Sequence, residues 1–343
     1  MAATDIVRRT RNMTRYVLGL DEPELGQSPR QLIASRDQVK LWRYDNDDRR
    51  LGPPVLLVMS LVTRPTVFDL QPGNSLIEQF CGAGFDVWMI DWGEPGPADS
   101  QNTLETYCDD YIPWAVDVTA GHTSFDSVTL FGYCFGGFLS VLSVAGNPSM
   151  PVENLVALAT PVAPERGPAQ LRPARLTARF DETGNVPAEA IRTAFSTLDP
   201  MGSWITSRVN LWQRMDDEDY VLAHRVMTNW GDDHIRFPGA TAKQMERSFG
   251  DGNQLLDGTF EMGGARVDLG AITVPFLSVI GERDHITPPA TSEPLMDLVG
   301  SEDKSELRVP AGHVGLFVGG SAAKYCIPGM LEWITEHSVA AAP

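Results

Sequence analysis

Lysine is scarce in this chain of 343 residues, and acidic residues are in excess. There are 45 aspartates and glutamates against 27 lysines and arginines, which gives a formal net charge of −18. The only lysines are Lys40, Lys243, Lys304 and Lys324. Nucleic acids and anionic lipid surfaces are bound through basic surfaces, so the charge balance argues against both as main partners. An anionic ligand would need a local group of positive charges, which arginine would have to supply.

Cysteine and long apolar runs are scarce as well. The four cysteines, Cys81, Cys108, Cys134 and Cys326, include no CxxC pair, so neither a disulfide framework nor a zinc site is predicted. No run approaches the roughly 18 apolar residues that a transmembrane helix needs. The segment 1–20 is rich in arginine but lacks the apolar core of a secretion signal, so it predicts an amphipathic helix. We therefore expect a cytoplasmic protein with no transmembrane segment.

Short apolar runs alternate with helical segments along much of the chain. Val55–Ser60 (VLLVMS) is typical of a strand that is buried on both faces of a parallel sheet. A helical segment runs from Leu104 to Ala115, and Pro113 is expected to kink or end it. This alternation predicts a mostly parallel sheet with helices on both faces. The further predicted strands are Phe85–Ile90, Ser127–Phe131, Leu155–Ala159, Pro275–Ile280 and Glu306–Val309.

The pattern changes between Pro164 and about Val267, where no convincing sheet strand occurs and aromatic residues stand at mixed spacings. We predict a mostly helical cap at residues 164–267, inserted into a core of residues 1–163 and 268–343. An independent second domain is the alternative. The strand signals that resume at Pro275 favour the insertion, because the sheet needs these strands to be complete.

A candidate nucleophile follows the strand Ser127–Phe131. The sequence Gly132–Gly137 (GYCFGG) has the pattern G-x-C-x-G-G and precedes an apolar helical run, which is the context of a nucleophile elbow. Such a turn strains the backbone at the nucleophile, here Cys134, and the glycines let strand and helix approach closely. The helix N-terminus would favour a thiolate. The alternative is a structural cysteine in a glycine-rich turn.

Two backbone N–H groups are candidate donors to an oxyanion. One belongs to Phe135, directly after the nucleophile, and the other to the loop after the first predicted strand, around Leu61 and Val62.

The other three cysteines stand in ordinary helical or loop contexts. Because free cysteine is often buried, we interpret them as structural residues: Cys81, Cys108 and Cys326.

The acid and the base of a triad are expected downstream in that order. Asp284, in the loop GERDHITPP after a predicted strand, is the best candidate for the acid, and Glu282 is its rival. His313, in PAGHVG after the last predicted strand, is the candidate general base. These residues predict an α/β-hydrolase fold. The remaining histidines are interpreted as surface or packing residues, with His285 shaping the acid's loop: His122, His224, His234, His285 and His337.

A cysteine nucleophile favours acyl transfer over hydrolysis. Exchange of a thioester onto a thiol is nearly isoenergetic, so an acyl-Cys134 can form from a coenzyme A ester and still react with an alcohol. In this scheme His313 deprotonates the thiol, and Asp284 orients the imidazole and stabilises its cation.

Segments along nearly the full chain resemble the catalytic subunit of class III polyhydroxyalkanoate synthases. The combination of DLQP, DWG, GxCxGG, DHxxPP and GHxG is far more specific than any one motif. The segments that carry it are GQSPRQLI at Gly26, LVTRPTVFDLQPGNSL at Leu61, DWGEPGPAD at Asp91, GYCFGG at Gly132, TPVAP at Thr160, MTNWGDD at Met227, GGARVDLGAITVP at Gly263, GERDHITPP at Gly281 and GHVGLFVGG at Gly312.

The resemblance implies Cys134 as nucleophile, with Asp284 and His313 as its partners. It also implies (3R)-hydroxyacyl-CoA substrates and a polyester that grows on Cys134 under a cap. We expect the acyl group to be short, as in 3-hydroxybutyryl-CoA. Coenzyme A is then a leaving group, and no cofactor is expected. Which of His313 and Asp284 activates the incoming hydroxyl stays open. A second, non-catalytic subunit, a homo- or hetero-oligomer and a place at the surface of polyester granules are also implied.

Trp230 lies in a segment that resembles one associated with subunit contacts, but core packing is the preferred interpretation. Two other functions are kept as alternatives. One is a cysteine-dependent thioesterase or esterase, in which water resolves the acyl-enzyme, and the other is a non-catalytic granule-associated binding protein.

Overall fold

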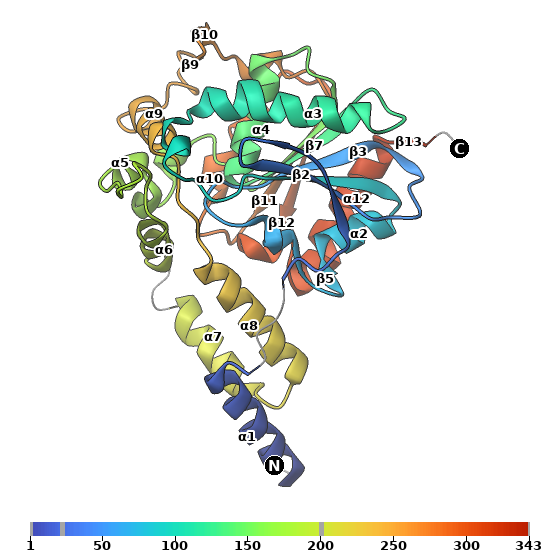
Figure 1. Cartoon of the computed structure of the whole chain (residues 1–343), viewed down its shortest axis with the longest axis vertical. Coiled ribbons are helices and arrows are strands. Elements are labelled where there is room, and N and C mark those ends of the chain that lie inside the picture. The colour runs from blue at the N-terminus through green and yellow to red at the C-terminus, as the bar shows by residue number, and fades with distance from the viewer. Residues whose placement is uncertain (1–2, 21–24, 199–201, 342–343) are drawn as a thin grey trace.

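A nine-stranded sheet forms the centre of the computed structural model, which describes residues 3–20, 25–198 and 202–341 (Figure 1). Eight strands follow the order β1-β2-β6-β3-β7-β8-β11-β12, and β13 pairs with β3. Their bounds are β1 Arg30–Arg36, β2 Val39–Tyr44, β3 Leu51–Val58, β6 Phe85–Asp91, β7 Val128–Tyr133, β8 Val152–Leu158, β11 Phe276–Gly281, β12 Lys304–Val309 and β13 Val339–Ala340. β4 Asp69–Gln71 and β5 Asn74–Ser75 form a separate small hairpin.

The predicted strands are the parallel part of this sheet. The pairs β6–β3, β3–β7, β7–β8, β8–β11 and β11–β12 are all parallel. The ends differ by a few residues from the prediction. β3 begins at Leu51, so Pro53 and Pro54 lie inside the strand, at the point where its register with β6 shifts.

The antiparallel edge formed by β1 and β2 was not among the predicted strands. In β2, the side chains of Val39, Leu41 and Tyr44 are buried and that of Lys40 is exposed. This partial alternation is typical of a strand that is solvated on one face. Unbroken apolar runs, on which the predicted strands were based, indicate only strands that are buried on both faces.

Helices cover both faces of the sheet (Figure 1). α3 Ile112–Gly121 and α4 Phe135–Gly146 pack on one face, and α2 Leu76–Gly82 and α12 Ile327–Glu336 on the other. Successive residues of β3 alternate between the two cores: Leu56 and Val58 join the first, and Val55 and Leu57 the second. The predicted mostly parallel sheet with helices on both faces is confirmed.

Pro113 does not end its helix. The chain forms a π turn at Thr106–Tyr111 and continues directly into α3, where Pro113 is in the first turn. Proline has no N–H, so the regular i→i−4 bond is missing there, and π turns occur where that bonding pattern is disturbed. The same arrangement recurs at Ala322–Cys326, a π turn before α12 and its Pro328.

The segment between β8 and β11 is mostly helical. It contains α5 Pro173–Leu176, α6 Ala188–Ser196, α7 Gly202–Gln213, α8 Glu218–Asp232, α9 Gly239–Phe249 and a small hairpin of β9 Glu261–Met262 and β10 Ala265–Arg266. None of its described strands joins the central sheet. Met245 and Phe249 of α9 pack in the same apolar cluster as α3 and α4. The division into core and cap at residues 164 and 267 stays a prediction. Two short helices follow β11, α10 Pro289–Ser292 and α11 Leu295–Leu298.

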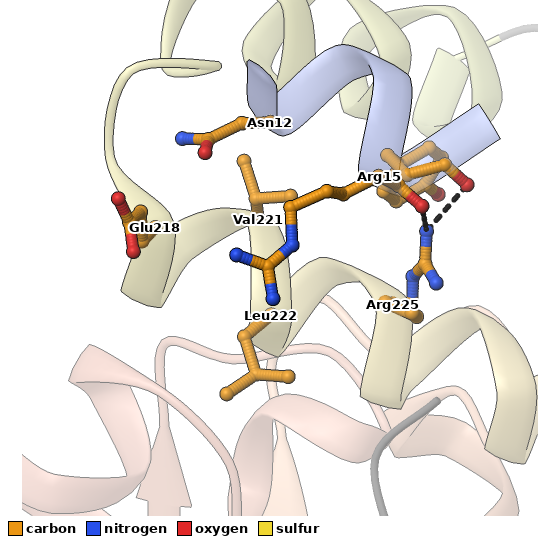
Figure 2. Close-up of a pocket in the computed structure, with 7 residues that line it drawn as sticks. Asn12, Arg15, Glu218, Val221, Leu222 and Arg225 are labelled. Carbon is orange, nitrogen blue, oxygen red and sulfur yellow. Dashed lines mark hydrogen bonds between the residues drawn. The ribbon is translucent and has the colours of Figure 1, made fainter. Parts of the chain in front are cut away.

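The predicted N-terminal helix is α1, Ala3–Leu18, and Met1 and Ala2 lie outside the described residues. It packs beside α7 and α8, away from the sheet (Figure 1). Tyr16 packs against the apolar side chains of Leu211 and Val221. The polar contacts include Arg9 Nε, which donates to Asp216 at 3.1 Å, and Asn12 Nδ2, which donates to the carbonyl oxygen of Met215 at 2.9 Å. Figure 2 shows Arg225 of α8 donating to carbonyl oxygens at the C-terminal end of α1, where a cation is favourable.

Several apolar side chains of α1 are exposed to solvent, and Ile6 and Val17 are 50% and 68% exposed. In the part of the chain that the structure describes, no helix is both long and apolar enough to span a bilayer.

Candidate active site

Cys134 stands at the junction between β7 and α4, in the sharp turn that the sequence predicts. Its φ of 55° and ψ of −122° are strained values for a residue with a side chain. The first N–H groups of α4 have no partner inside the helix, and they surround this position. The turn therefore presents the thiol at a helix N-terminus.

The glycines of the motif allow the close approach of strand and helix. A Cβ atom on Gly136 would lie 2.2 Å from the carbonyl oxygen of Val58, and one on Gly137 would lie 1.9 Å from Thr160 Oγ1. A Cβ on Gly132 would lie 2.4 Å from the Cα of Gly137. None of these three sites has room for a side chain, which explains the G-x-C-x-G-G pattern.

Gly136→Ala is expected to lower the free energy of unfolding by about 2–3 kcal/mol, because the new methyl group meets backbone atoms of β3 that cannot rotate away. Urea denaturation measures the change. Gly146→Ala, at the other end of the same helix, is the control, since its Cβ would meet only side-chain atoms, Met262 Cε at 3.3 Å and Asp109 Oδ1 at 3.8 Å. Equal stability of the two variants would contradict the packing argument.

His313 and Asp284 are brought together from two loops, after β12 and after β11. His313 Nδ1 and Asp284 Oδ2 are 2.6 Å apart, and both residues are buried. The other oxygen, Oδ1, accepts the backbone N–H groups of Ile286 and Thr287, each at 2.8 Å. Thr287 Oγ1 donates to Oδ2 at 2.7 Å. The carboxylate is thus held with one oxygen on the backbone and the other on the imidazole.

The Asp284 carboxylate and the His313 imidazolium stabilise each other's charged form. Burial alone would lower the pKa of the His313 imidazole, but the Asp284 carboxylate and then the Cys134 sulfur outweigh burial and raise it to about 10. Burial would raise the pKa of Asp284, yet His313 and Thr287 hold it below its usual value. The carboxyl group is therefore ionised at neutral pH, and the imidazole accepts a proton readily.

Cys134 is the third member of this group. Its side chain and His313 line the same cavity, and the Cys134 sulfur contributes to the raised pKa of the imidazole. Tyr133 packs its ring against the imidazole, with 4.9 Å between the ring centroids. The three residues follow the chain order nucleophile, acid and base, and the acid contacts the base.

The other candidates for these roles do not reach the site. Glu282, the rival acid, is exposed, and so is His285. Of the remaining cysteines, Cys108 and Cys326 are buried and Cys81 is half-buried. Burial raises the pKa of the Cys81 and Cys326 thiols to about 12, which makes both poor nucleophiles.

The cavity above Cys134 has a volume of about 250 Å³ and a mostly apolar wall. Its roof comes from the segment between β8 and β11, through Arg192 and Phe195 of α6 and Trp230 of α8. Trp230 is buried in an apolar cluster with Tyr133, and it also lines the cavity. His234, interpreted from the sequence as a packing residue, also lines the cavity. No sequence motif marks Arg192 or Phe195 for this position.

The two proposed oxyanion donors lie beside the thiol. Phe135 follows Cys134 in the first turn of α4, and Val62 lines the cavity. The carbonyl oxygen of Val62 accepts the N–H of Ile235 at 3.1 Å, so this loop is tied to the segment after α8. The donor roles of Phe135 and Val62 stay predictions.

Comparison with known proteins places this site in a family. The model of the α/β-hydrolase fold matches residues 53–320. The chain is 34% identical to the poly(3-hydroxyalkanoate) polymerase subunit PhaC of Allochromatium vinosum, over 97% of this chain and 96% of the relative. It is 33% identical to that of Thiocystis violacea, over 94% and 92% of the two chains. This chain belongs to the poly(3-hydroxyalkanoate) polymerase family.

One further relative and two solved structures of other proteins are also similar to this chain. The PhaC subunit of Haloferax mediterranei is 32% identical, over 98% of this chain and 70% of the relative. A thermophilic esterase of Thermogutta terrifontis superposes with a TM-score of 0.54 at 19% identity, covering 91% of this chain and 99% of the esterase. A monoacylglycerol lipase of Paleococcus ferrophilus gives 0.52 at 18% identity, covering 87% and 99%. These two structures confirm the predicted α/β-hydrolase fold of this polymerase family member.

Proposed function

We propose that this chain polymerises (3R)-hydroxyacyl-CoA esters and that the growing polyester is held as a thioester on Cys134. The observation that carries the proposal is a cysteine, in place of a serine, at the same cavity as the His313 imidazole that Asp284 holds, in a member of a polymerase family. A thiol can take an acyl group from a coenzyme A thioester with little change in free energy, so the acyl-enzyme stays reactive toward an alcohol.

The first half of the reaction loads the enzyme. His313 takes the proton of the Cys134 thiol, and the sulfur attacks the thioester carbonyl of the substrate. The N–H groups of Phe135 and Val62 would stabilise the negative oxygen of the tetrahedral intermediate. The C–S bond to coenzyme A then breaks, its thiolate takes the proton from His313, and an acyl-Cys134 remains.

The second half extends the polymer. The 3-hydroxyl of a second hydroxyacyl-CoA attacks the carbonyl carbon of the acyl-Cys134, an ester bond forms, and the C–S bond to Cys134 breaks. The Cys134 thiolate takes back the hydroxyl's proton, and the elongated acyl-CoA then loads Cys134 again as in the first half, with release of coenzyme A. His313 lines the cavity, whereas Asp284 lies behind it and already accepts four hydrogen bonds. This placement favours His313 as the group that takes the hydroxyl proton, with Asp284 stabilising the cation.

The size of the cavity supports a short acyl group, such as 3-hydroxybutyryl. Its volume of about 250 Å³ is at or below the lower end of the range for ligand pockets, about 300–1,000 Å³. Coenzyme A enters only as a leaving group, and the proposal includes no cofactor. A second, non-catalytic subunit, an oligomeric state and a cytoplasmic location at the granule surface are part of the same proposal.

Product analysis tests the function. Purified protein is supplied with 3-hydroxybutyryl-CoA, with and without a candidate partner subunit, and both coenzyme A release and the acyl product are measured. Insoluble polyester supports polymerisation. Stoichiometric free 3-hydroxybutyrate without oligomers would identify a thioesterase instead, and no release of coenzyme A under either condition would favour the non-catalytic binding protein.

A further inference from the structure

One segment of this acidic molecule, between β8 and α6, carries several arginines. The segment 166–180 contains Arg166, Arg172, Arg175 and Arg179 and no acidic residue, in a chain with a net charge of −18. Within the described part of the chain, Arg172, Arg175 and Arg179 make no ion pair. Many other arginines, such as Arg43 and Arg64, are paired with carboxylates. These three arginines are therefore available to an anionic ligand.

Two of the three line a large groove. The groove has a volume of about 810 Å³ and lies between the segment that carries Arg175 and Arg179 and one face of α6, with Ala190, Thr193 and Ala194. Among the described residues that line it, the one acidic side chain is that of Glu189, whose carboxylate is 3.6 Å from Arg192. The charge of Glu189 is thus offset, and the balance at the groove is positive.

The opposite face of α6 forms part of the catalytic cavity. Arg192 and Phe195 line the cavity that holds Cys134, whereas Ala190, Thr193 and Ala194 line the groove. A single helix, about 10–12 Å across with its side chains, therefore separates the two hollows. The pantetheine arm of coenzyme A has about twelve bonds between its sulfur and its diphosphate, as many as about four extended residues, or ~14 Å. The arm is long enough to pass over α6.

We propose that the groove beside α6 binds the adenosine 3′-phosphate and diphosphate end of the acyl-CoA substrate, through Arg175 and Arg179. The guanidinium group matches the phosphate oxygens in charge and geometry, and it remains charged at every working pH. Arg192, at the roof of the cavity, would lie on the path between the phosphates and the thioester. This inference rests on the proposed function, since it names the part of that substrate which lies outside the catalytic cavity.

The test compares two substrates on the double variant R175Q/R179Q. For 3-hydroxybutyryl-CoA we expect KM to rise by about tenfold or more, with kcat within about twofold of the wild type, because the lost contacts bind ground state and transition state alike. For 3-hydroxybutyryl-pantetheine, which has no nucleotide, KM should not change. Arg247→Gln, which removes an exposed arginine of α9, is the matched control and should leave both substrates unaffected.

An unchanged KM for the coenzyme A ester would overturn the inference, and so would an equal rise for both substrates, which would indicate a structural effect on α6. A direct measurement separates this result from the proposed function. Adenosine 3′,5′-bisphosphate is titrated calorimetrically into Cys134→Ala, with and without R175Q/R179Q. Binding that weakens by about tenfold or more in the triple variant supports the groove even if the wild type makes no polyester, and equal binding refutes it.

Discussion

Cys134→Ala is expected to reduce the release of coenzyme A from 3-hydroxybutyryl-CoA by about 10⁴-fold or more, because no other group can form the acyl-enzyme. Cys134 is 9% exposed and lines an existing cavity. Removal of its sulfur therefore enlarges a space that is already there, and the melting temperature should change little. Release of free coenzyme A, measured with a thiol reagent after the protein is removed, gives the rate.

Cys81→Ala is the matched control. Its thiol is half-buried in α2, where burial and the nearby Asp86 raise its pKa to about 12, so this variant should keep wild-type activity. Cys134→Ser is expected to lose most activity too, since a hydroxyl is a poorer nucleophile beside the same base. Full coenzyme A release by the alanine variant would show that the nucleophile has been misassigned.

Asp284→Asn is expected to lower kcat by about 10²- to 10⁴-fold while the fold persists. The two backbone N–H groups of Ile286 and Thr287 should keep the amide oxygen in the place of Oδ1, so the amide NH₂ would face His313 Nδ1. Nδ1 would then have to accept a hydrogen bond, which leaves the proton on Nε2. An imidazole in this tautomer cannot take the proton of Cys134.

The pH dependence separates this explanation from a loss of stability. Without the carboxylate, the pKa of His313 should fall from its raised value, because Asp284 is the main group that raises it. NMR titration of the imidazole measures the shift, and thermal unfolding checks the fold. Glu282→Gln, at the exposed rival position, should behave as the wild type. An unshifted His313 in Asp284→Asn would contradict the assignment of the pair.

Much of the parallel sheet could be predicted because β3, β6, β7, β8 and β11 are buried on both faces and so are mostly apolar, whereas β12 is more polar and partly exposed. β1 and β2 were not predicted, because an edge strand that is solvated on one face mixes apolar and polar residues and resembles an irregular segment. Pro113 was expected to kink or end its helix. The helix does not end there, because a π turn at Thr106–Tyr111 leads directly into α3.

The sequence by itself predicted Cys134, Asp284 and His313 as a triad, because a nucleophile elbow needs glycines at set positions and the partners follow strands in a set order. Only the tertiary structure showed which of the two carboxylates in this loop contacts the imidazole. Asp284 does, whereas Glu282, two residues earlier, is exposed. Only the tertiary structure could place Arg192, Phe195 and His234 at the roof of the cavity. These residues come from a segment without motif or regular period, and their position depends on how that segment packs over the core.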